Sequence, residues 1–188
     1  MKSTTQKAPL EKVLSYLRYK RTLKFIKNKK VIDFGCGKTN WNEKFIGKYP
    51  KIIHGIDSSI MNLDKKDSLI NIYKEIDELP DNNYEVILSM AVFEHINPND
   101  LIEVLKKLAI FTSNDAIIFG TTPTPLSRPI LEFLAYKLKL IDESQIKDHK
   151  VYYDELWLSQ MLLNTDWILT SYKTFQFGLN GEFIISKR

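Results

Sequence analysis

Cysteine is almost absent from this sequence, because Cys36 is the only one in 188 residues. A single thiol cannot form a disulfide within the chain, and proteins built on disulfides belong to oxidising compartments. The segment from Met1 to Lys12 also lacks the apolar run of a secretory signal peptide. We therefore expect a reducing compartment and predict a cytoplasmic location.

Long apolar runs and a strong excess of one charge are missing as well. No window approaches the roughly 18 consecutive apolar residues of a membrane-spanning helix, so no transmembrane segment is expected. The 27 basic residues are nearly balanced by 23 acidic ones, which leaves a net charge of +4. The lysines are scattered, whereas a nucleic-acid binder usually carries a dense basic patch. The charge permits an anionic substrate and gives no strong signal for nucleic acid.

The composition that remains is typical of one globular domain. Apolar residues make up 44% of the chain and charged residues 27%, which argues against disorder. A chain of this length can bury one sizeable core, and it is short for two. We predict a single domain over 1–188, with a helical segment at 1–29 and substrate-side helices and a loop at 123–165.

Strand patterns and helix patterns alternate along the chain. Strands are predicted at 31–34, 52–56, 69–76, 84–90, 116–119, 167–177 and 182–187. Helices are predicted at 9–28, 40–49, 97–111, 129–140 and 153–164. Asn97 is expected to cap the third of these helices, with Pro98 at its first position.

This alternation favours a parallel sheet that is covered by helices on both faces. Only Gly178 to Gly181 joins the last two strands, which is too short for a parallel crossover and predicts an antiparallel hairpin. The predicted fold is therefore α/β: a Rossmann-like three-layer sandwich with a mostly parallel seven-stranded sheet that ends in an antiparallel hairpin.

The helix predicted near 129–141 carries many apolar side chains with lysines beside them. The apolar residues are Ile130, Leu131, Phe133, Leu134, Tyr136 and Leu138. We expect this helix to pack on the sheet, as most amphipathic helices do. A lid over the substrate and a face that touches a membrane or a partner remain alternatives.

A glycine turn follows the first predicted strand, at Asp33-Phe-Gly-Cys-Gly37. Glycines let the backbone turn tightly and approach a ligand closely, and free amides lie at the start of the next helix. A P-loop requires a glycine where Ile32 stands, which excludes that class. A dinucleotide fold places its third glycine where Asn40 stands, which weakens that class. A tight turn without a ligand remains open.

Asp57 ends the second predicted strand, 20 residues after Gly37. A carboxylate at this place can accept hydrogen bonds from both hydroxyls of an adenosine ribose. It can also cap the turn at Ser58-Ser59, and the two roles are compatible. The glycine turn and the acid together favour a nucleoside site.

With these motifs the sequence resembles a class I S-adenosylmethionine-dependent methyltransferase over about residues 30–122. The segments that carry the resemblance are Val31–Gly37, His54–Ser59, Glu75–Pro80, Tyr84–Met90 and Phe93–His95. The resemblance implies the seven-stranded sheet of that family and S-adenosylmethionine as the cofactor, with S-adenosylhomocysteine as the product. The residues implied at the cofactor are Asp33, Gly35, Cys36, Gly37, Asp57, Ser58, Glu75, Ile76, Ser89 and Met90.

The resemblance also assigns these residues their parts. Asp33 organises the glycine turn beside the methionine moiety, and Asp57 holds the ribose. Glu75 and Ile76 border the adenine, whereas Ser89 and Met90 lie between cofactor and acceptor. Cys36, placed between two glycines, is interpreted as a small residue and not as a nucleophile.

The acceptor side is less defined by the sequence. His149 lies in a polar loop that is expected to cross the mouth of the sheet, and we predict it as the base, with capping of a helix as the alternative. His95 is a second candidate, with local packing as its alternative. Tyr152 and Tyr153 are expected on the substrate side, and no metal site is predicted.

The predicted function is transfer of a methyl group by in-line displacement to a small-molecule or glycan-type acceptor. The segment after the fourth strand, Ser89–Phe93, lacks the Asp/Asn-Pro-Pro-aromatic motif of nucleic-acid amine methyltransferases. The segments Thr121–Pro129 and Asp148–Tyr152 resemble small-molecule members, including some associated with surface-glycan synthesis. A non-catalytic cofactor-binding subunit and an NAD-dependent oxidoreductase are the rival hypotheses, and a peripheral membrane contact stays open.

Overall fold

The computed structural model describes residues 19–37, 48–59, 71–137 and 146–188. The first half of the helix predicted at 9–28 and most of the helix predicted at 40–49 lie outside the described residues. So do the end of the helix predicted near 129–140 and residues 60–70. Residues 19–26 are helical, as predicted.

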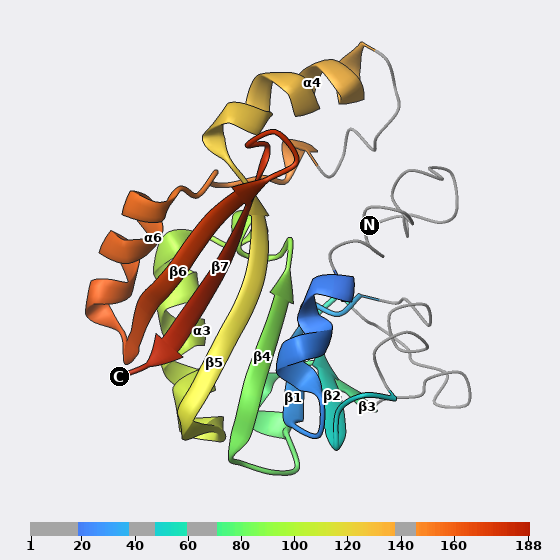
Figure 1. The fold of residues 1–188 in the computed structure, drawn as a ribbon, viewed down its shortest axis with the longest axis vertical. Coiled ribbons are helices and arrows are strands. Elements are labelled where there is room, and N and C mark those ends of the chain that lie inside the picture. Colours follow the sequence, from blue (N-terminus) through green and yellow to red (C-terminus); the bar gives the residue numbers. More distant parts are fainter. Residues whose placement is uncertain (1–18, 38–47, 60–70, 138–145) are drawn as a thin grey trace.

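Seven strands form one sheet in the order β3-β2-β1-β4-β5-β7-β6 (Figure 1). They are β1 (Lys30–Phe34), β2 (Ile52–Ile56), β3 (Asn71–Tyr73), β4 (Tyr84–Met90), β5 (Thr112–Pro123), β6 (Trp167–Phe175) and β7 (Asn180–Lys187). The first five pair in parallel, and β7 runs antiparallel to both β5 and β6. The predicted α/β fold, with its terminal antiparallel hairpin, is confirmed.

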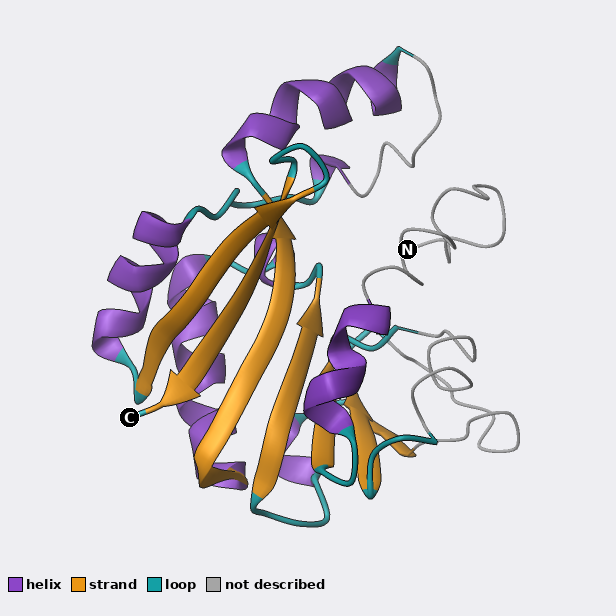
Figure 2. Cartoon of the chain, in the orientation of Figure 1, coloured by secondary structure: helices purple, strands orange, loops and turns teal. Residues whose placement is uncertain are grey.

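Helices lie on both faces of this sheet (Figure 2). Neighbouring residues of β1 point to opposite faces, as the pleat of a strand requires. Val31 packs in a core cluster with Tyr19 and Ile26 of the helix at 19–26. Ile32 packs in the other cluster, with Leu105 of α3 (Pro98–Phe111) and with residues of α6 (Glu155–Met161). These two apolar clusters hold the three layers together.

Four short 3₁₀ helices connect the larger elements. They are η1 (Ile76–Glu78), η2 (Phe93–His95), η3 (Pro125–Ser127) and η4 (Leu162–Asn164). Asn97 occupies the N-cap position of α3, yet its side chain does not cap the helix as predicted. Its amide nitrogen instead donates to Asp100 Oδ2 at 3.3 Å.

Several strands differ in length from the prediction, and β6 ends at Phe175, two residues earlier than expected. β3 spans only Asn71–Tyr73 within the described residues. β5 starts directly after α3 and is much longer than the expected 116–119. The reason is pairing: Thr112 lies opposite Tyr84 before a bulge, and the distal end pairs with β7 up to Pro123. β7 begins at Asn180, so residues 176–179 form the connection in place of Gly178 to Gly181.

The expectation that the helix near 129–141 packs on the sheet is wrong for its described part. This helix, α4 (Arg128–Tyr136), stands beyond the carboxyl ends of the strands (Figure 1). Ile130, Phe133 and Tyr136 are 41%, 54% and 40% exposed. The pattern of the sequence correctly gave the helix an apolar face, but packing against the sheet does not cover that face.

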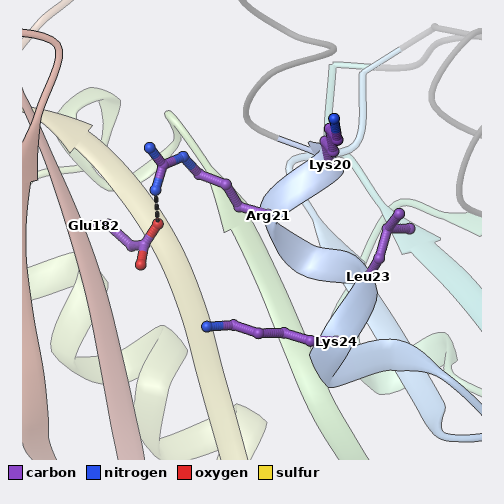
Figure 3. A pocket seen from close by; sticks show the side chains of 5 residues that line it. All are labelled: Lys20, Arg21, Leu23, Lys24 and Glu182. Carbon is purple, nitrogen blue, oxygen red and sulfur yellow. Dashed lines mark hydrogen bonds and ion pairs between the residues drawn. The ribbon is translucent and has the colours of Figure 1, made fainter.

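An ion pair joins the helix at 19–26 to β7, at the antiparallel end of the sheet. Arg21 Nη1 lies 2.9 Å from Glu182 Oε2 of β7, and the Arg21 guanidinium also lies over the ring of Phe175. Arg21 and Glu182 line a pocket of about 350 Å³, to which Lys20 and Lys24 add two more cations (Figure 3). Among the described residues, no helix is both long and apolar enough to cross a membrane.

Candidate functional site

The glycine turn after β1 is held in a conformation that other residues rarely adopt. Gly35 and Gly37 have φ angles of +72° and +65°, in the left-handed region. The Gly35 amide donates to the carbonyl of Ile56 at 2.8 Å, which fixes the turn to the end of β2. A Cβ on Gly35 would lie 2.4 Å from a methyl group of Val92, whereas one on Gly37 would meet no atom of the described residues within 4 Å. The turn is therefore closed at Gly35 and open at Gly37.

Cys36 points away from this opening and into the sheet. Its side chain is 7% exposed, and a Cβ on Gly55 of β2 would lie 2.6 Å from the Cys36 sulfur. The buried position agrees with the interpretation of Cys36 as a small packing residue and gives no sign of a nucleophile.

Asp33 lies beneath the turn and is 1% exposed. The hydroxyl of Tyr19 donates to its carboxylate at 3.3 Å, so the helix at 19–26 contributes directly to the site. A buried carboxylate is stabilised when it accepts hydrogen bonds. Asp33 thus links the turn to the helix that covers it.

Asp57, at the end of β2, binds the other side of the same turn. Its Oδ2 accepts the amide of Gly37 at 2.7 Å, and its Oδ1 accepts the amide and the hydroxyl of Ser59 at 2.9 and 2.5 Å. The predicted local turn at Ser58-Ser59 is therefore present, and Ser58 is exposed. An ionised carboxylate has about four acceptor sites, so Asp57 retains capacity for a ligand hydroxyl.

The end of β3 supplies a second border of the site. Glu75 is exposed and precedes η1, in which Ile76 is buried. Glu78 fixes this turn, because its carboxylate accepts the amides of Lys74 and Glu75 at 2.9 and 3.4 Å. The Glu75 side chain is therefore displayed from a firmly held backbone.

The ends of β4 and β5 present buried hydroxyls to the same edge of the sheet. Ser89 and Thr121 are each 1% exposed, and neither hydroxyl has a hydrogen-bond partner among the described residues. Met90 pairs with Thr121 across the two strands and is also buried. A buried polar atom without a partner is costly, which suggests that a ligand contacts this edge.

Comparison with known proteins identifies the family of this chain. The family model described as "Methyltransferase domain" matches residues 6–171 of the chain. The chain belongs to the class I S-adenosylmethionine-dependent methyltransferases. This confirms the resemblance found in the sequence, and S-adenosylmethionine is the cofactor of the family. No curated protein matches the sequence.

Solved structures of methyltransferases share the fold. A SAM-dependent methyltransferase from Archaeoglobus fulgidus is 17% identical, with a TM-score of 0.63 and coverage of 93% of this chain and 94% of that one. PH0226 from Pyrococcus horikoshii is 14% identical, with a TM-score of 0.68 and coverage of 97% and 93%. Magnesium protoporphyrin IX methyltransferase from Synechocystis, crystallised with S-adenosylhomocysteine, is 12% identical, with a TM-score of 0.56 and coverage of 95% and 82%.

The residues of this methyltransferase fit a sulfonium nucleoside. Three features lie at the carboxyl ends of the adjacent strands β1, β2 and β4. They are, in that order, the open space at Gly37, the acceptor oxygens of Asp57 and the hydroxyl of Ser89, which has no partner among the described residues. Ligands of open α/β sheets bind at such edges. S-adenosylmethionine bound here supplies an activated methyl group, and the chain has to hold and orient it.

The segment after β4 leads from the glycine turn to the predicted acceptor side. Ala91 has a positive φ of 60°, and its amide donates to the carbonyl of Thr121 at 2.9 Å. Val92 then lies against Gly35, and η2 follows with Glu94 and His95. Because only two residues separate Val92 from His95, His95 lies near the glycine turn.

His95 and His149 lie side by side, although 54 positions separate them. Their ring centroids are 4.9 Å apart, with the rings edge to face. Lys150 donates its amide to the carbonyl of Glu94 at 2.7 Å, which attaches the polar loop to η2. Burial, together with a smaller effect of the neighbouring His95, lowers the pKa of His149 to about 4, and Asp148 partly opposes this shift. Burial also lowers the pKa of His95, against the opposing effect of Asp148. Both rings are neutral at pH 7.

Beside these histidines lies a pocket of about 670 Å³ between α4 and the polar loop. Its lining includes Pro125, Arg128, Glu132, Tyr136, Ile146, Lys147, His149, Lys150, Val151 and Tyr152. The hydroxyl of Tyr152 lies 3.1 Å from His149 Nδ1, which agrees with its predicted place. Tyr153 is fully buried and packs in the core, so it does not line the pocket as expected. Its ring faces inward, edge to face with Trp157.

Sequence reasoning missed several residues of this site. Tyr19 holds Asp33 from a helix that carried no motif, and Val92 closes the turn at Gly35. Arg128, Lys147 and Lys150 give the pocket its cations, yet nothing in the sequence marks any of them as a site residue. Glu94 was visible only as part of the family motif Phe93–His95. The contacts that assemble these residues are long-range and leave no local pattern.

Proposed function

We propose that this chain transfers the methyl group of S-adenosylmethionine to a small-molecule or glycan-type acceptor. One observation carries the proposal: the segment Val92–His95 joins the glycine turn to the pocket at His149. Val92 contacts the turn at Gly35, and His95 contacts His149 of the pocket. A donor site and an acceptor pocket thus share one continuous wall.

The charge of the pocket supports an acidic acceptor. Among the described residues that line it, Arg128, Lys147 and Lys150 contribute three cations and Glu132 one carboxylate. Arg128 binds Glu132 at 3.0 Å and thereby places its guanidinium at the rim. Arginine and lysine side chains are suited to carboxylates and phosphates. We propose an acceptor that carries a carboxylate or phosphate beside the group to be methylated.

The methyl transfer requires little from the chain beyond positioning of the two reactants. In an in-line displacement, a lone pair of the acceptor forms the new bond to the methyl carbon while the carbon–sulfur bond breaks. The sulfur keeps that electron pair, which yields neutral S-adenosylhomocysteine. Holding the two reactants in line supplies about 7–11 kcal/mol in favourable cases. If the acceptor is a hydroxyl, its proton must also leave.

We propose His149 as the first candidate to receive this proton and His95 as the second. Neutral imidazoles can accept protons, and the pKa of about 4 makes His149 a weak base that suits an acidic hydroxyl. The test is the pH profile of kcat/KM for His149→Ala with a turned-over acceptor. Loss of rate across the profile supports the role. Full turnover at every pH contradicts it.

The enzyme itself is tested with S-adenosylmethionine labelled in its methyl group. The purified full-length chain is incubated with acidic phenols, hydroxy acids and phosphorylated sugars, and the transfer of label is counted. We expect transfer to one of these classes, with Arg128→Gln raising KM more than it lowers kcat. Cofactor binding without transfer to any acceptor would support the non-catalytic subunit. Binding of NAD in place of the sulfur nucleosides would overturn the proposal.

A further inference from the structure

Glu94, His95 and His149 form a compact group that the proposed chemistry does not fully use. One ligand atom of each residue lies within 4.8 Å of the other two. Glu94 is 1% exposed, and the two histidines are half-buried. Lys150 and Val151 donate their amides to the carbonyl of Glu94, at 2.7 and 3.4 Å, so that backbone hydrogen bonds hold the loop of His149 against η2.

The donor set is that of a divalent transition metal. One carboxylate and two neutral imidazoles are the ligands of several catalytic zinc sites, which keep further positions open for water or substrate. The same set serves other first-row metals, whereas magnesium prefers oxygen ligands alone. Ligand atoms on one such ion lie up to about 4 Å apart, so small side-chain rotations bring the group into range.

An oxygen atom lies beside Nδ1 of each imidazole, at hydrogen-bond distance for His149 and at ion-pair distance only for His95. Nδ1 of His149 lies 3.1 Å from the hydroxyl of Tyr152, and Nδ1 of His95 lies 3.4 Å from Oδ2 of Asp148. Histidines that bind metal usually donate their second N–H to an oxygen, which fixes the tautomer and the ring. An Nδ1–H at each ring leaves both Nε2 atoms with a lone pair for an ion.

We propose that Glu94, His95 and His149 bind one divalent transition metal ion, with Zn²⁺ as its test ion, at the wall between the methyl donor and the acceptor pocket. The ion would keep open positions toward the pocket and hold an acceptor hydroxyl there. A bound cation lowers the pKa of a coordinated hydroxyl. This inference rests on the proposed function, and it makes His149 a ligand in place of a direct base.

The binding experiment needs no acceptor. The full-length chain is freed of metal with a chelator and titrated with Zn²⁺ by calorimetry and with Co²⁺ by visible absorption. We expect one site per chain and a d–d absorption band of four- to five-coordinate Co²⁺. The variants Glu94→Gln and His149→Asn should each lose at least 10-fold in affinity, a loss at the lower end of that seen for altered metal-site partners.

His54 supplies the matched control, because it is the only other histidine of the sequence and lies in β2, away from the group. His54→Asn should leave Zn²⁺ affinity unchanged. Circular dichroism and S-adenosylmethionine binding check that each variant is folded, and His95→Asn replaces any variant that is not. No Zn²⁺ binding by a wild-type chain that binds the cofactor overturns this inference alone. Equal Zn²⁺ affinity in the ligand variants overturns it as well, since the ion then binds elsewhere. Failure of the cofactor itself to bind would overturn the proposed function.

Discussion

Asp57 uses both of its oxygens to hold the backbone of the site. Its carboxylate accepts the amides of Gly37 and Ser59 before any ligand binds. A preorganised acceptor of this kind loses little freedom when a ribose hydroxyl is added. The residue that shapes the turn is thus also the one predicted to hold the ribose of the cofactor.

We expect Asp57→Ala to weaken binding of S-adenosylmethionine by about 1.5–3 kcal/mol, because hydrogen bonds to a charged group are lost. Isothermal calorimetry measures the change. Glu103→Ala is the control, since Glu103 is an exposed carboxylate of α3 that pairs with Lys106 at 2.8 Å outside the site. An affinity that Asp57→Ala leaves unchanged would refute the assignment of the ribose to this residue.

The two glycines of the turn separate a structural role from a ligand role. Both lie at positive φ, so alanine costs about 1–2 kcal/mol of unfolding free energy at either position. Gly35→Ala adds a clash with Val92, and overpacking costs about 1–3 kcal/mol more.

Gly37→Ala should therefore be the milder of the two in urea unfolding, yet it should lose most of the affinity for cofactor. Its new methyl group enters the open space at the turn. Calorimetry on both variants makes the comparison. If Gly37→Ala binds the cofactor as the wild type does, this space is not where the cofactor lies.

His54 should make the stability of the protein depend on pH. Burial lowers its pKa below the usual 6.5, an effect that Asp81 only partly opposes, and its Nδ1 lies 2.5 Å from the hydroxyl of Tyr84. The unfolded chain then binds a proton more readily than the folded one. Stability is full above about pH 6.5 and falls as the pH drops below it.

Urea unfolding of wild type and of His54→Gln between pH 7.5 and 5 isolates this effect, since His95 and His149 contribute to both proteins. The stability difference between the two should shrink as the pH falls. Parallel curves would show that His54 is not the group responsible.

At the scale of elements, two helices with similar apolar patterns have different surroundings. α3 is buried along Leu101, Leu105 and Leu108, whereas α4 leaves Ile130 and Phe133 exposed. A pattern shows that a helix has an apolar face, but it does not show what covers the face. For this reason the exposure of α4 was not predictable from sequence.

A pair of phenylalanines tests this difference. Phe133→Ala in α4 should change the unfolding free energy by less than about 0.5 kcal/mol, as at other surface sites. Phe119→Ala in β5, which is fully buried against Phe25, should cost about 3–5 kcal/mol. Urea unfolding monitored by circular dichroism measures both. A large loss for Phe133→Ala would mean that part of the molecule covers α4.

The strands show the same division between local and distant causes. β4 was predicted at its observed bounds because it is one apolar run after the turn at Asp81–Asn83. β5 begins at Thr112, where Thr-Ser-Asn-Asp resembles a turn, and only pairing with Tyr84 across a bulge makes it a strand. The glycine turn was likewise readable from local sequence. The contact of His95 with His149 was not, because it depends on a backbone bond between distant segments.

For the whole molecule, cofactor binding should appear as added thermal stability. A ligand that binds only the folded state at 100 times its Kd adds about 2.7 kcal/mol. For a chain of this size, each kcal/mol shifts Tm by about 2–4 °C, so S-adenosylhomocysteine should raise Tm by about 5–11 °C. Differential scanning fluorimetry with NAD as the control measures this. No shift with either sulfur nucleoside would contradict the cofactor site.

The place of β7 has a consequence for how the chain is made. β7 follows β6 in sequence but lies between β5 and β6 in the sheet. During synthesis, β6 therefore emerges before β7, the strand with which it must pair. Until β7 emerges, the edge of β5 that pairs with it stays unpaired. Five of the seven strands, β1 to β5, can pair early, whereas the other end of the sheet must await residues 180–187. Chaperones that shield open strand edges would act in that interval, and any truncation before Asn180 would make it permanent.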